Sequence, residues 1–365
     1  MVELALFVPF SFGRGVERVN VTLAKALAQR GIEVDVVVAR RDGPYFDELD
    51  GKVRVVDLAA DRTLASLPRL ATYLRRFRPR AVLSAPDSGS LVALWAQWLA
   101  RVDSRMVVVT HAVLSQSLRR KSAAYRRTFP RLLHRTYPRA DAIVAVSEQV
   151  KEDLIRVAGL TCARIEVIPN PVVHDRMLDR ACAGTAHPWL QEGRSAPVVL
   201  SVGRLHEEKN YSDLVRAFAR LRRERPARLI ILGDGADSAH LKALARELGV
   251  TDDVDLPGFV TNPYGHMARA DLFALSSRYE ALPTVLIEAM ACGCPIVATD
   301  CPGGVREILE DGRHGRLVPV GDVAAMARAM LETLDRPANP EQLRQRAMDF
   351  HVDRIVERYR KVLRV

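Results

Sequence analysis

The chain has 365 residues, of which 48% are hydrophobic and 27% are charged, and its formal net charge at pH 7 is +10. A chain of this length is expected to form two domains. No apolar run approaches the roughly 18 residues that span a bilayer. The first residues, "MVELALFVPF", are typical of a buried strand and not of a signal peptide. The five cysteines lack the paired spacing of a disulfide framework, so we expect a protein of the reducing cytoplasm.

The first half of the chain predicts a parallel α/β domain. Residues 2–39 have the pattern of a strand, a glycine loop, an amphipathic helix and a second strand. Further continuous apolar runs, expected of strands buried on both faces, lie at residues 80–85, 105–110, 142–147 and 164–169. Helical patterns separate most of these runs, which favours a parallel sheet covered by helices.

The second half repeats this pattern from residue 196 to residue 235. Later strands are expected at residues 254–259, 272–277, 295–299 and 315–320. A weakly periodic segment, residues 171–196, separates the halves. We therefore predict an α/β fold with domains at residues 1–175 and 190–349, and a C-terminal helix at 350–365 that returns to the first domain.

Ligands of open α/β sheets bind beyond the carboxyl ends of the strands. Arg204 and Lys209, in "SVGRLHEEKN", follow such a strand, and two cations there could neutralise a diphosphate. A solvated surface pair is the alternative. Neither glycine loop matches G-x-G-x-x-G, which removes the main sequence support for a nicotinamide cofactor.

The segment "RYEALPTVLIEAM", residues 278–290, predicts a second part of the same site. A helix should begin at Pro283 or Thr284, where backbone amides can bind an anion. Glu288, about one turn into this helix, could hold both hydroxyls of a ribose, whereas Glu280 could reach a sugar beyond the phosphates. The alternatives are a helix-stabilising charge for Glu280 and a solvated helix face for Glu288.

The ordered motifs "GRGVER", "HAVLS", "VIPNPV", "SVGRLHEEKN", "LPGFV" and "SSRYEALPTVLIEAMACGCPIVATD" resemble those of the family-4 retaining glycosyltransferases. The resemblance spans nearly the whole chain and is most specific over residues 198–320. It implies the GT-B fold, in which two Rossmann-like domains face each other across a cleft. It also implies an N-terminal acceptor-binding domain and a C-terminal domain that binds a nucleotide sugar.

The resemblance further implies roles for individual residues. Glu280 and Glu288 match the family's Glu-x7-Glu motif, with Glu288 on the nucleotide ribose and Glu280 near the donor sugar. Arg204 and Lys209 should bind the donor diphosphate, and His111 should contact the donor sugar. The remaining donor-binding positions implied by the family are Gly15, Gly258, Phe259, Val260, Leu282, Pro283, Thr284 and Val285.

Two positions depart from the family pattern, and one motif competes with it. Arg14 stands where the family commonly has the first of two glycines, and Ala281 stands where it usually has glycine. The triplet Asp253–Asp255 has the spacing of a metal–nucleotide motif of another glycosyltransferase fold, but we interpret it as a solvated turn. We expect no metal and no cofactor beyond the UDP-sugar donor.

The positive charge lies in the first half, where residues 1–180 hold 29 Lys and Arg against 19 Asp and Glu. Residues 117–139 contain eight of these cations and no acid, with Tyr125, Phe129, Leu132 and Leu133 between them. The segment could contact an anionic membrane, bind an acceptor diphosphate, bind nucleic acid or form a solvated helix. We favour the membrane, and the cations assigned to the acceptor or membrane are Arg119, Arg120, Lys121, Arg126, Arg127 and Arg131.

The resemblance, taken together with the basic first half, implies a retaining glycosyltransferase at the cytoplasmic face of the inner membrane. It would move a hexose or N-acetylhexosamine from a UDP-sugar to a lipid-linked or membrane-linked glycan in cell-envelope polysaccharide biosynthesis. One rival is a UDP-sugar epimerase or hydrolase of the same fold, which needs no acceptor. The other is a basic protein that binds nucleic acid or another polyanion and keeps a relict donor cleft, although we expect no nucleic-acid partner.

Overall fold

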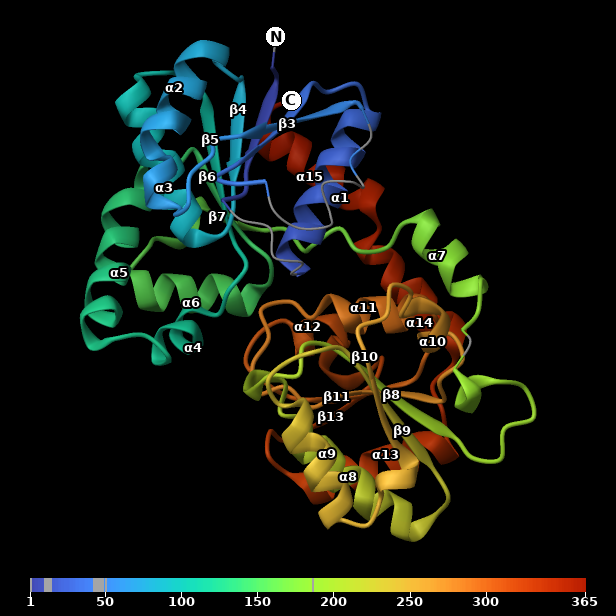
Figure 1. The fold of residues 1–365 in the computed structure, drawn as a ribbon. Helices are drawn as coiled ribbons and strands as arrows, with labels where there is room; N and C mark the ends of the chain where they lie inside the picture. Colours follow the sequence, from blue (N-terminus) through green and yellow to red (C-terminus); the bar gives the residue numbers. More distant parts are fainter. Residues whose placement is uncertain (1, 10–14, 42–48, 50, 186) are drawn as a thin grey trace. The chain divides into compact units, whose positions relative to one another are not determined.

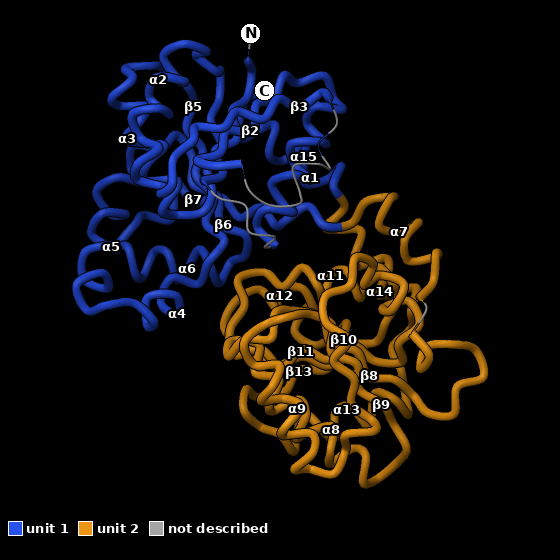
Figure 2. Tube along the Cα trace, viewed as in Figure 1, with its two compact units in different colours: residues 1–172, 352–365 blue, residues 173–351 orange. Residues whose placement is uncertain are grey.

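The computed structural model describes residues 2–9, 15–41, 49, 51–185 and 187–365. They form two compact units (Figures 1 and 2). Unit 1 comprises residues 1–172 and 352–365, and unit 2 comprises residues 173–351. The sequence places these divisions near residues 175–190 and 350, and the ligands assigned to the two domains stay predictions.

Unit 1 contains a seven-stranded parallel sheet in the order β3-β2-β1-β4-β5-β6-β7 (Figure 1). Its strands consist largely of buried Val, Leu, Ile and Ala, as expected where helices cover both faces of a sheet. The strands are β1 (Leu4–Phe7), β2 (Val34–Val38), β3 (Val53–Asp57), β4 (Ala81–Ser84), β5 (Arg105–Thr110), β6 (Ala142–Ala145) and β7 (Ile165–Val167).

The helices of unit 1 lie in two layers. One layer contains α2, α3 and α5, with α2 and α5 each packed against α3, whereas α1 packs against α15 beside β4 and β5 (Figure 1). The return of the last helix to unit 1 buries Ile355, Val356, Tyr359, Val362 and Leu363. The helices are α1 (Gly15–Gln29), α2 (Leu67–Phe77), α3 (Asp87–Ala100), α4 (Leu114–Arg119), α5 (Ala123–Thr136), α6 (Glu148–Ala158) and α15 (Val352–Leu363), and a short 3₁₀ turn, η3 (Tyr137–Arg139), follows α5.

Unit 2 contains a six-stranded parallel sheet in the order β10-β9-β8-β11-β12-β13. Its strands are β8 (Val198–Val202), β9 (Arg228–Leu232), β10 (Val254–Gly258), β11 (Leu272–Leu275), β12 (Ile296–Thr299) and β13 (Arg316–Val318). Its helices are α7 (Asp175–Cys182), α8 (Tyr211–Glu224), α9 (Ser238–Glu247), α10 (Tyr264–Met267), α11 (Thr284–Ala291), α12 (Val305–Ile308), α13 (Val323–Asp335) and α14 (Pro340–Ala347). The prediction of two parallel-sheet α/β domains is therefore confirmed.

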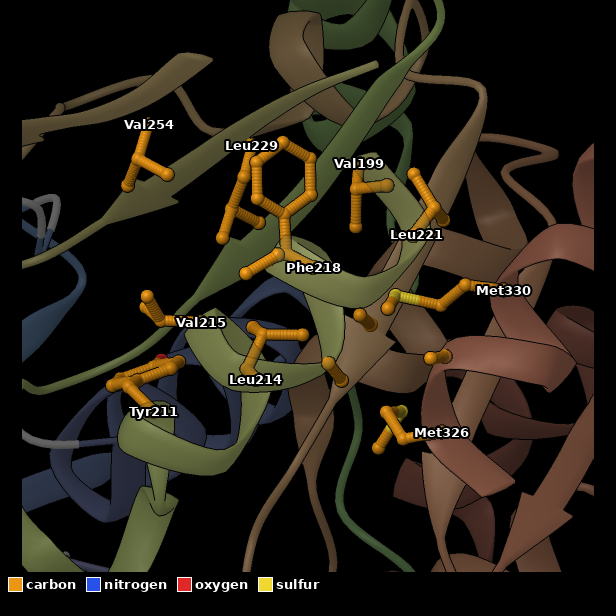
Figure 3. Packing of buried hydrophobic residues seen from close by; sticks show 14 of the residues in the cluster. Val199, Tyr211, Leu214, Val215, Phe218, Leu221, Leu229, Val254, Met326 and Met330 are labelled. Atoms are coloured by element: carbon orange, nitrogen blue, oxygen red, sulfur yellow. The ribbon is translucent and has the colours of Figure 1, made fainter. Parts of the chain in front are cut away.

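The core of unit 2 follows from the apolar spacing of α8. Leu214, Phe218 and Leu221 are fully buried at spacings of three and four residues, and they face the β8–β9 sheet and α13 (Figure 3). Burying a side chain of this size contributes roughly 1.5–3 kcal/mol. This packing fixes the carboxyl ends of β8 and β9, from which the site loops emerge.

Candidate functional site

The strand order of the unit 2 sheet reverses between β8 and β11. From this point, β9 and β10 lie to one side and β12 and β13 to the other. Ligands of such sheets bind at the carboxyl ends of the strands where the order reverses. The loops that follow β8 and β11 carry Arg204, Lys209 and Glu280, so the topology brings these three predicted residues to one edge.

Lys209 and Glu280 are joined directly across this edge. The Lys209 Nζ lies 2.6 Å from Glu280 Oε1, and the Ser277 hydroxyl donates to the same oxygen at 2.6 Å. The Ser276 hydroxyl donates to the Lys209 backbone carbonyl at 2.7 Å. Burial alone would lower the pKa of Lys209, but Glu280 and its other neighbours raise it, so the amine stays charged. These contacts overturn the alternative of a solvated surface pair for Lys209.

Arg204 is held by a carboxylate that the sequence analysis did not single out. Its Nη2 lies 2.8 Å from Glu208 Oε1, while the Tyr279 hydroxyl donates to Glu208 Oε2 at 3.3 Å. The Arg278 amide donates to the Glu208 carbonyl at 2.8 Å. Glu208 thus connects the loop after β8 to the loop after β11, and it leaves the guanidinium more than half exposed at the sheet edge.

Gly303 sets the backbone position of Glu280. Its φ is +122°, and a Cβ atom added there would lie 1.2 Å from the Glu280 carbonyl oxygen. The Glu280 amide donates to the Pro302 carbonyl at 2.9 Å, and the Gly304 amide donates to the Ala281 carbonyl at 2.9 Å. This close approach of two chain segments is possible only with glycine.

Glu288 lies inside the helix that begins beside these loops. α11 starts at Thr284, after Pro283, and the first amides of a helix have no acceptor within it. Glu288 is only 6% exposed, which excludes the alternative of a solvated helix face. Its charge adds to the effect of burial in raising the pKa of the Cys292 thiol to about 12. Leu282 and Pro283 are buried, and Thr284 and Val285 are half-buried.

The loop after β10 presents an aromatic ring to solvent at the same edge of the sheet. Phe259 is 70% exposed, and its amide donates to Asp234 Oδ2 at 3.1 Å. The Gly258 carbonyl accepts from the Gly233 amide at 2.8 Å, which fixes the loop to the end of β9. Val260 is half-buried. An exposed ring on a fixed backbone is suited to stacking against a flat ligand such as a nucleobase.

His111 and Gly15 belong to unit 1, and their approach to the residues of unit 2 stays a prediction. His111 follows β5 and is half-buried, and burial lowers its pKa to about 4. The preceding Thr110 donates to the buried Asp87 at 2.7 Å, as Tyr137 does at 2.8 Å. Gly15 is the first residue of α1, while Arg14 lies outside the described residues.

The lowered pKa of His111 predicts a pH dependence of folding. The unfolded state binds a proton near pH 6.5 and the folded state only near pH 4, so the stability is present above pH 6.5 and falls between these values. Between pH 7 and pH 4, the unfolding free energy of His111→Gln should fall by about 3 kcal/mol less than that of the wild type. Urea titrations at both pH values measure this, and parallel losses would contradict it.

The basic segment 117–139 forms two helices, because Ser122 caps α5 by accepting from the Tyr125 amide. All six cations assigned to the acceptor or membrane are exposed on it: Arg119, Arg120, Lys121, Arg126, Arg127 and Arg131. Phe129 and Leu133 are buried in unit 1, so these two side chains are not available to a membrane. Tyr125 and Leu132 alone of the four are exposed. Among the described residues, no helix has the length and hydrophobicity to cross a bilayer.

The triplet Asp253–Asp255 begins in a 3₁₀ turn, Thr251–Asp253, and continues into β10, so the predicted turn includes only its first residue. Arg222 Nε donates to Asp253 Oδ2 at 2.7 Å, and His187 Nε2 lies 2.9 Å from Asp255 Oδ2. Val254 and Asp255 already belong to β10. Asp253 therefore forms an ion pair with Arg222, and Asp255 forms a hydrogen bond with His187. The expectation of metal independence stays a prediction.

Comparisons with known proteins cover both units. The family described as "Glycosyl transferases group 1" matches residues 189–350, and "Glycosyltransferase Family 4" matches residues 13–176. The lipopolysaccharide core biosynthesis glycosyltransferase LpsE of Rhizobium meliloti is 30% identical over 331 residues, which cover 88% of this chain and 86% of LpsE.

A second relative transfers a sugar onto a lipid-linked glycan, according to its name. It is the N-acetylgalactosamine-N,N'-diacetylbacillosaminyl-diphospho-undecaprenol 4-alpha-N-acetylgalactosaminyltransferase of Campylobacter jejuni. The two chains are 34% identical over 223 residues, which cover 60% of this chain and 59% of the relative.

Among solved structures, HepE of Anabaena in complex with UDP and glucose has a TM-score of 0.81, 22% identity and full coverage of both chains. The apo form of the lipopolysaccharide outer core galactosyltransferase WaaB has a TM-score of 0.75 and 21% identity, with 99% of each chain covered.

Proposed function

Since the chain belongs to the family-4 glycosyltransferases with the GT-B fold, we propose that it moves a hexose or N-acetylhexosamine from a UDP-sugar to a lipid-linked or other membrane-linked glycan, with retention of anomeric configuration. The product would enter a cell-envelope polysaccharide. The observation that carries this proposal is the Lys209–Glu280 pair, which lies at the strand-order reversal beside the start of α11.

The geometry supports a separate role for each of the charged and polar groups of the donor site. As the bond to the sugar breaks, negative charge develops on the departing diphosphate. Lys209 would stabilise it as a point charge, Arg204 as a hydrogen-bonding fork, and the first amides of α11 as fixed dipoles. Lys209 would exchange Glu280 for a phosphate, and Glu280 would then accept from hydroxyls of the donor sugar. The loop 258–260 would hold the uracil.

Binding of UDP to Glu288 tests the donor site directly. Glu288→Gln keeps the volume of this buried side chain but removes its charge, and we expect UDP to bind roughly 10- to 100-fold more weakly, because hydrogen bonds from the ribose to a charged acceptor would be lost. Calorimetric titration without added metal measures the affinity. Glu247→Gln is the matched control, because Glu247 lies exposed on α9 of the same unit.

Equal affinities of the wild type and Glu288→Gln for UDP would remove Glu288 from the ribose site. Binding of GDP or ADP in place of UDP would correct the donor. Product analysis with donor alone separates transfer from epimerisation or hydrolysis. Retention is tested by the anomeric configuration of the transferred sugar.

The exposed cations of α4 and α5 support a peripheral association with the cytoplasmic face of the inner membrane. Each arginine near an anionic bilayer contributes about 1 kcal/mol. The triple variant Arg126→Gln/Arg127→Gln/Arg131→Gln should therefore bind phosphatidylglycerol vesicles roughly 100-fold more weakly than the wild type. Arg216→Gln/Arg220→Gln/Arg223→Gln, which removes three exposed charges from α8 of unit 2, should bind as the wild type does. Equal losses in both variants would indicate an effect of net charge alone.

A further inference from the structure

An open groove lies at the edge of unit 1 opposite the carboxyl ends of its strands. It is formed where α2 and α3 end and where η3 follows α5. Trp98 and Leu99 line it, together with Arg75, Arg101 and Arg139. The donor-site residues described above lie in the other unit, and His111 and Gly15 lie at the opposite edge of this sheet, so the proposed transfer does not use the groove.

The groove exposes apolar side chains that the fold does not bury. Trp98 is 70% exposed and Leu99 is 42% exposed, although both belong to the last turn of a helix whose other face is packed in the core. Tryptophan has an apolar body and a polar N–H, and it is enriched where proteins meet the interface of a bilayer. Exposure of Trp98 and Leu99 to water is unfavourable in free energy. Burial of the two side chains in such an interface would recover this free energy.

Arginines surround this apolar pair. The Arg75 Nη2 donates to the Leu99 carbonyl at 3.1 Å, which joins the ends of α2 and α3. Arg139 and Arg101 are exposed. Two acids, Asp103 and Asp141, lie in the neighbouring connections, and the Asp141 carboxylate accepts from the Met106 amide at 2.7 Å. Cations therefore dominate the rim.

Arg101 occupies a backbone position at which glycine would be less strained. Arg101 terminates α3 in the left-handed region, with φ of 54°, and Arg78 terminates α2 in the same way, with φ of 42°. Glycine is the usual residue at this position because a Cβ is strained there. A cation at a helix C-terminus does complement the helix dipole. The helix dipole does not explain why arginine, and not glycine, occupies these two left-handed positions. It also does not explain why Trp98, which lies between them in the sequence, is exposed.

We propose that this groove is a second membrane contact, in which Trp98 and Leu99 enter the headgroup–acyl boundary of an anionic bilayer while Arg75, Arg101 and Arg139 bind lipid phosphates. The inference deepens the peripheral association proposed for α5 and rests on it. Because η3 continues α5 and packs against α3, Arg139 connects the groove to α5, which carries three of the cations. Two contacts on one layer would fix the rotation of unit 1 on the membrane, which a single helix cannot do.

Separate variants of the full chain test the arginines of the groove and its apolar side chains. Sedimentation with vesicles of 30% phosphatidylglycerol in phosphatidylcholine measures binding. Trp98→Ala/Leu99→Ala should reduce it at least tenfold, whereas Leu64→Ala, which removes a 62%-exposed leucine elsewhere in unit 1, should not. Arg101→Gly should reduce binding about fivefold. The glycine relieves the left-handed strain, so its melting temperature should equal or exceed that of the wild type.

Insertion itself is read from the fluorescence of Trp98, in a Trp95→Phe/Trp189→Phe background that removes the other two tryptophans. Brominated phosphatidylcholine in the same vesicles should quench Trp98. Retained UDP affinity in every variant would show that the donor-binding unit is intact.

The outcomes separate the groove from the α5 surface. If the groove variants bind as the wild type does while the α5 triple variant loses binding, the groove inference falls and the α5 proposal stands. If the wild type binds no anionic vesicle, both fall, whereas UDP binding still tests the donor site. If soluble polyanions shift the Trp98 emission and brominated lipid does not quench it, the partner is a polyanion and the membrane assignment is overturned.

Discussion

Replacing Lys209 with alanine is expected to lower kcat for sugar transfer by roughly 100- to 1,000-fold, the range typical of removing one preorganised group that stabilises developing charge. The KM for the donor should change much less, because the charge on the diphosphate grows as the glycosidic bond breaks. Initial rates of UDP release, measured with the preferred donor and acceptor, test this.

Two further variants make the Lys209 result specific. Lys242→Ala removes an exposed lysine from α9 of the same unit and should leave kcat unchanged. Lys209→Ala/Glu280→Gln tests whether the 2.6 Å pair is only structural. If neutralising Glu280 restored the rate of the Lys209 variant, the loss would come from an unpaired carboxylate in the site, and the role of Lys209 on the diphosphate would be wrong.

Gly303→Ala is expected to be more damaging than any substitution of an exposed site residue. The added Cβ would lie 1.2 Å from the Glu280 carbonyl oxygen, so the two segments would have to separate. Separation of the segments would break two backbone hydrogen bonds, and an alanine at position 303 would also be strained at positive φ. The total cost should be about 3 kcal/mol or more. Urea denaturation measures the stability. Because Glu280 would shift, donor turnover should also fall in whatever protein remains folded.

Gly321→Ala is the matched control for Gly303. Gly321 also has positive φ, +84°, but a Cβ there would meet nothing within 4 Å. It should lose only about 1 kcal/mol, which is the backbone strain without the clash. Equal losses in the two variants would show that backbone conformation alone explains Gly303, and the proposed support of Glu280 would not stand.

The parallel sheets could be predicted because their strands are continuous apolar runs. Apolar side chains lie on both faces of strands such as Val198–Val202 and Leu272–Leu275. Helices must therefore cover both faces of the sheet. The spacing of Leu214, Phe218 and Leu221 likewise marks the buried face of α8. Such patterns are local, so they are visible without knowledge of which strands pair.

The pairings within the site could not be predicted in this way. Lys209 and Glu280 are 71 residues apart, and nothing in either motif shows that their side chains meet. Glu208 was visible beside Lys209, but its role depends on Tyr279, which the fold brings from another loop. The proximity of Gly303 to Glu280 is similar, since the "CPGG" motif shows only that the chain needs freedom there.

It was harder still to predict which residues of the basic helices face solvent and which face the core. Arg126, Arg127 and Arg131 are exposed as their charge predicts, but Phe129 and Leu133 turn inward to the core of unit 1. A helix with arginines on several sides gives a weak periodic signal. The position of Trp98 is the opposite case, because an apolar sequence such as "SLVALWAQWLA" predicts burial and the end of α3 nevertheless leaves it exposed.

The return of α15 has a consequence for biosynthesis. Unit 1 is built from residues 1–172 and 352–365, so the ribosome must complete all of unit 2 before the helix that covers β4 and β5 exists. At bacterial or eukaryotic elongation rates this interval lasts roughly 10–40 s. Unit 2 is contiguous and can fold as it emerges. During this interval the apolar face of the first unit that α15 will cover stays exposed, and a chaperone would have to shield it.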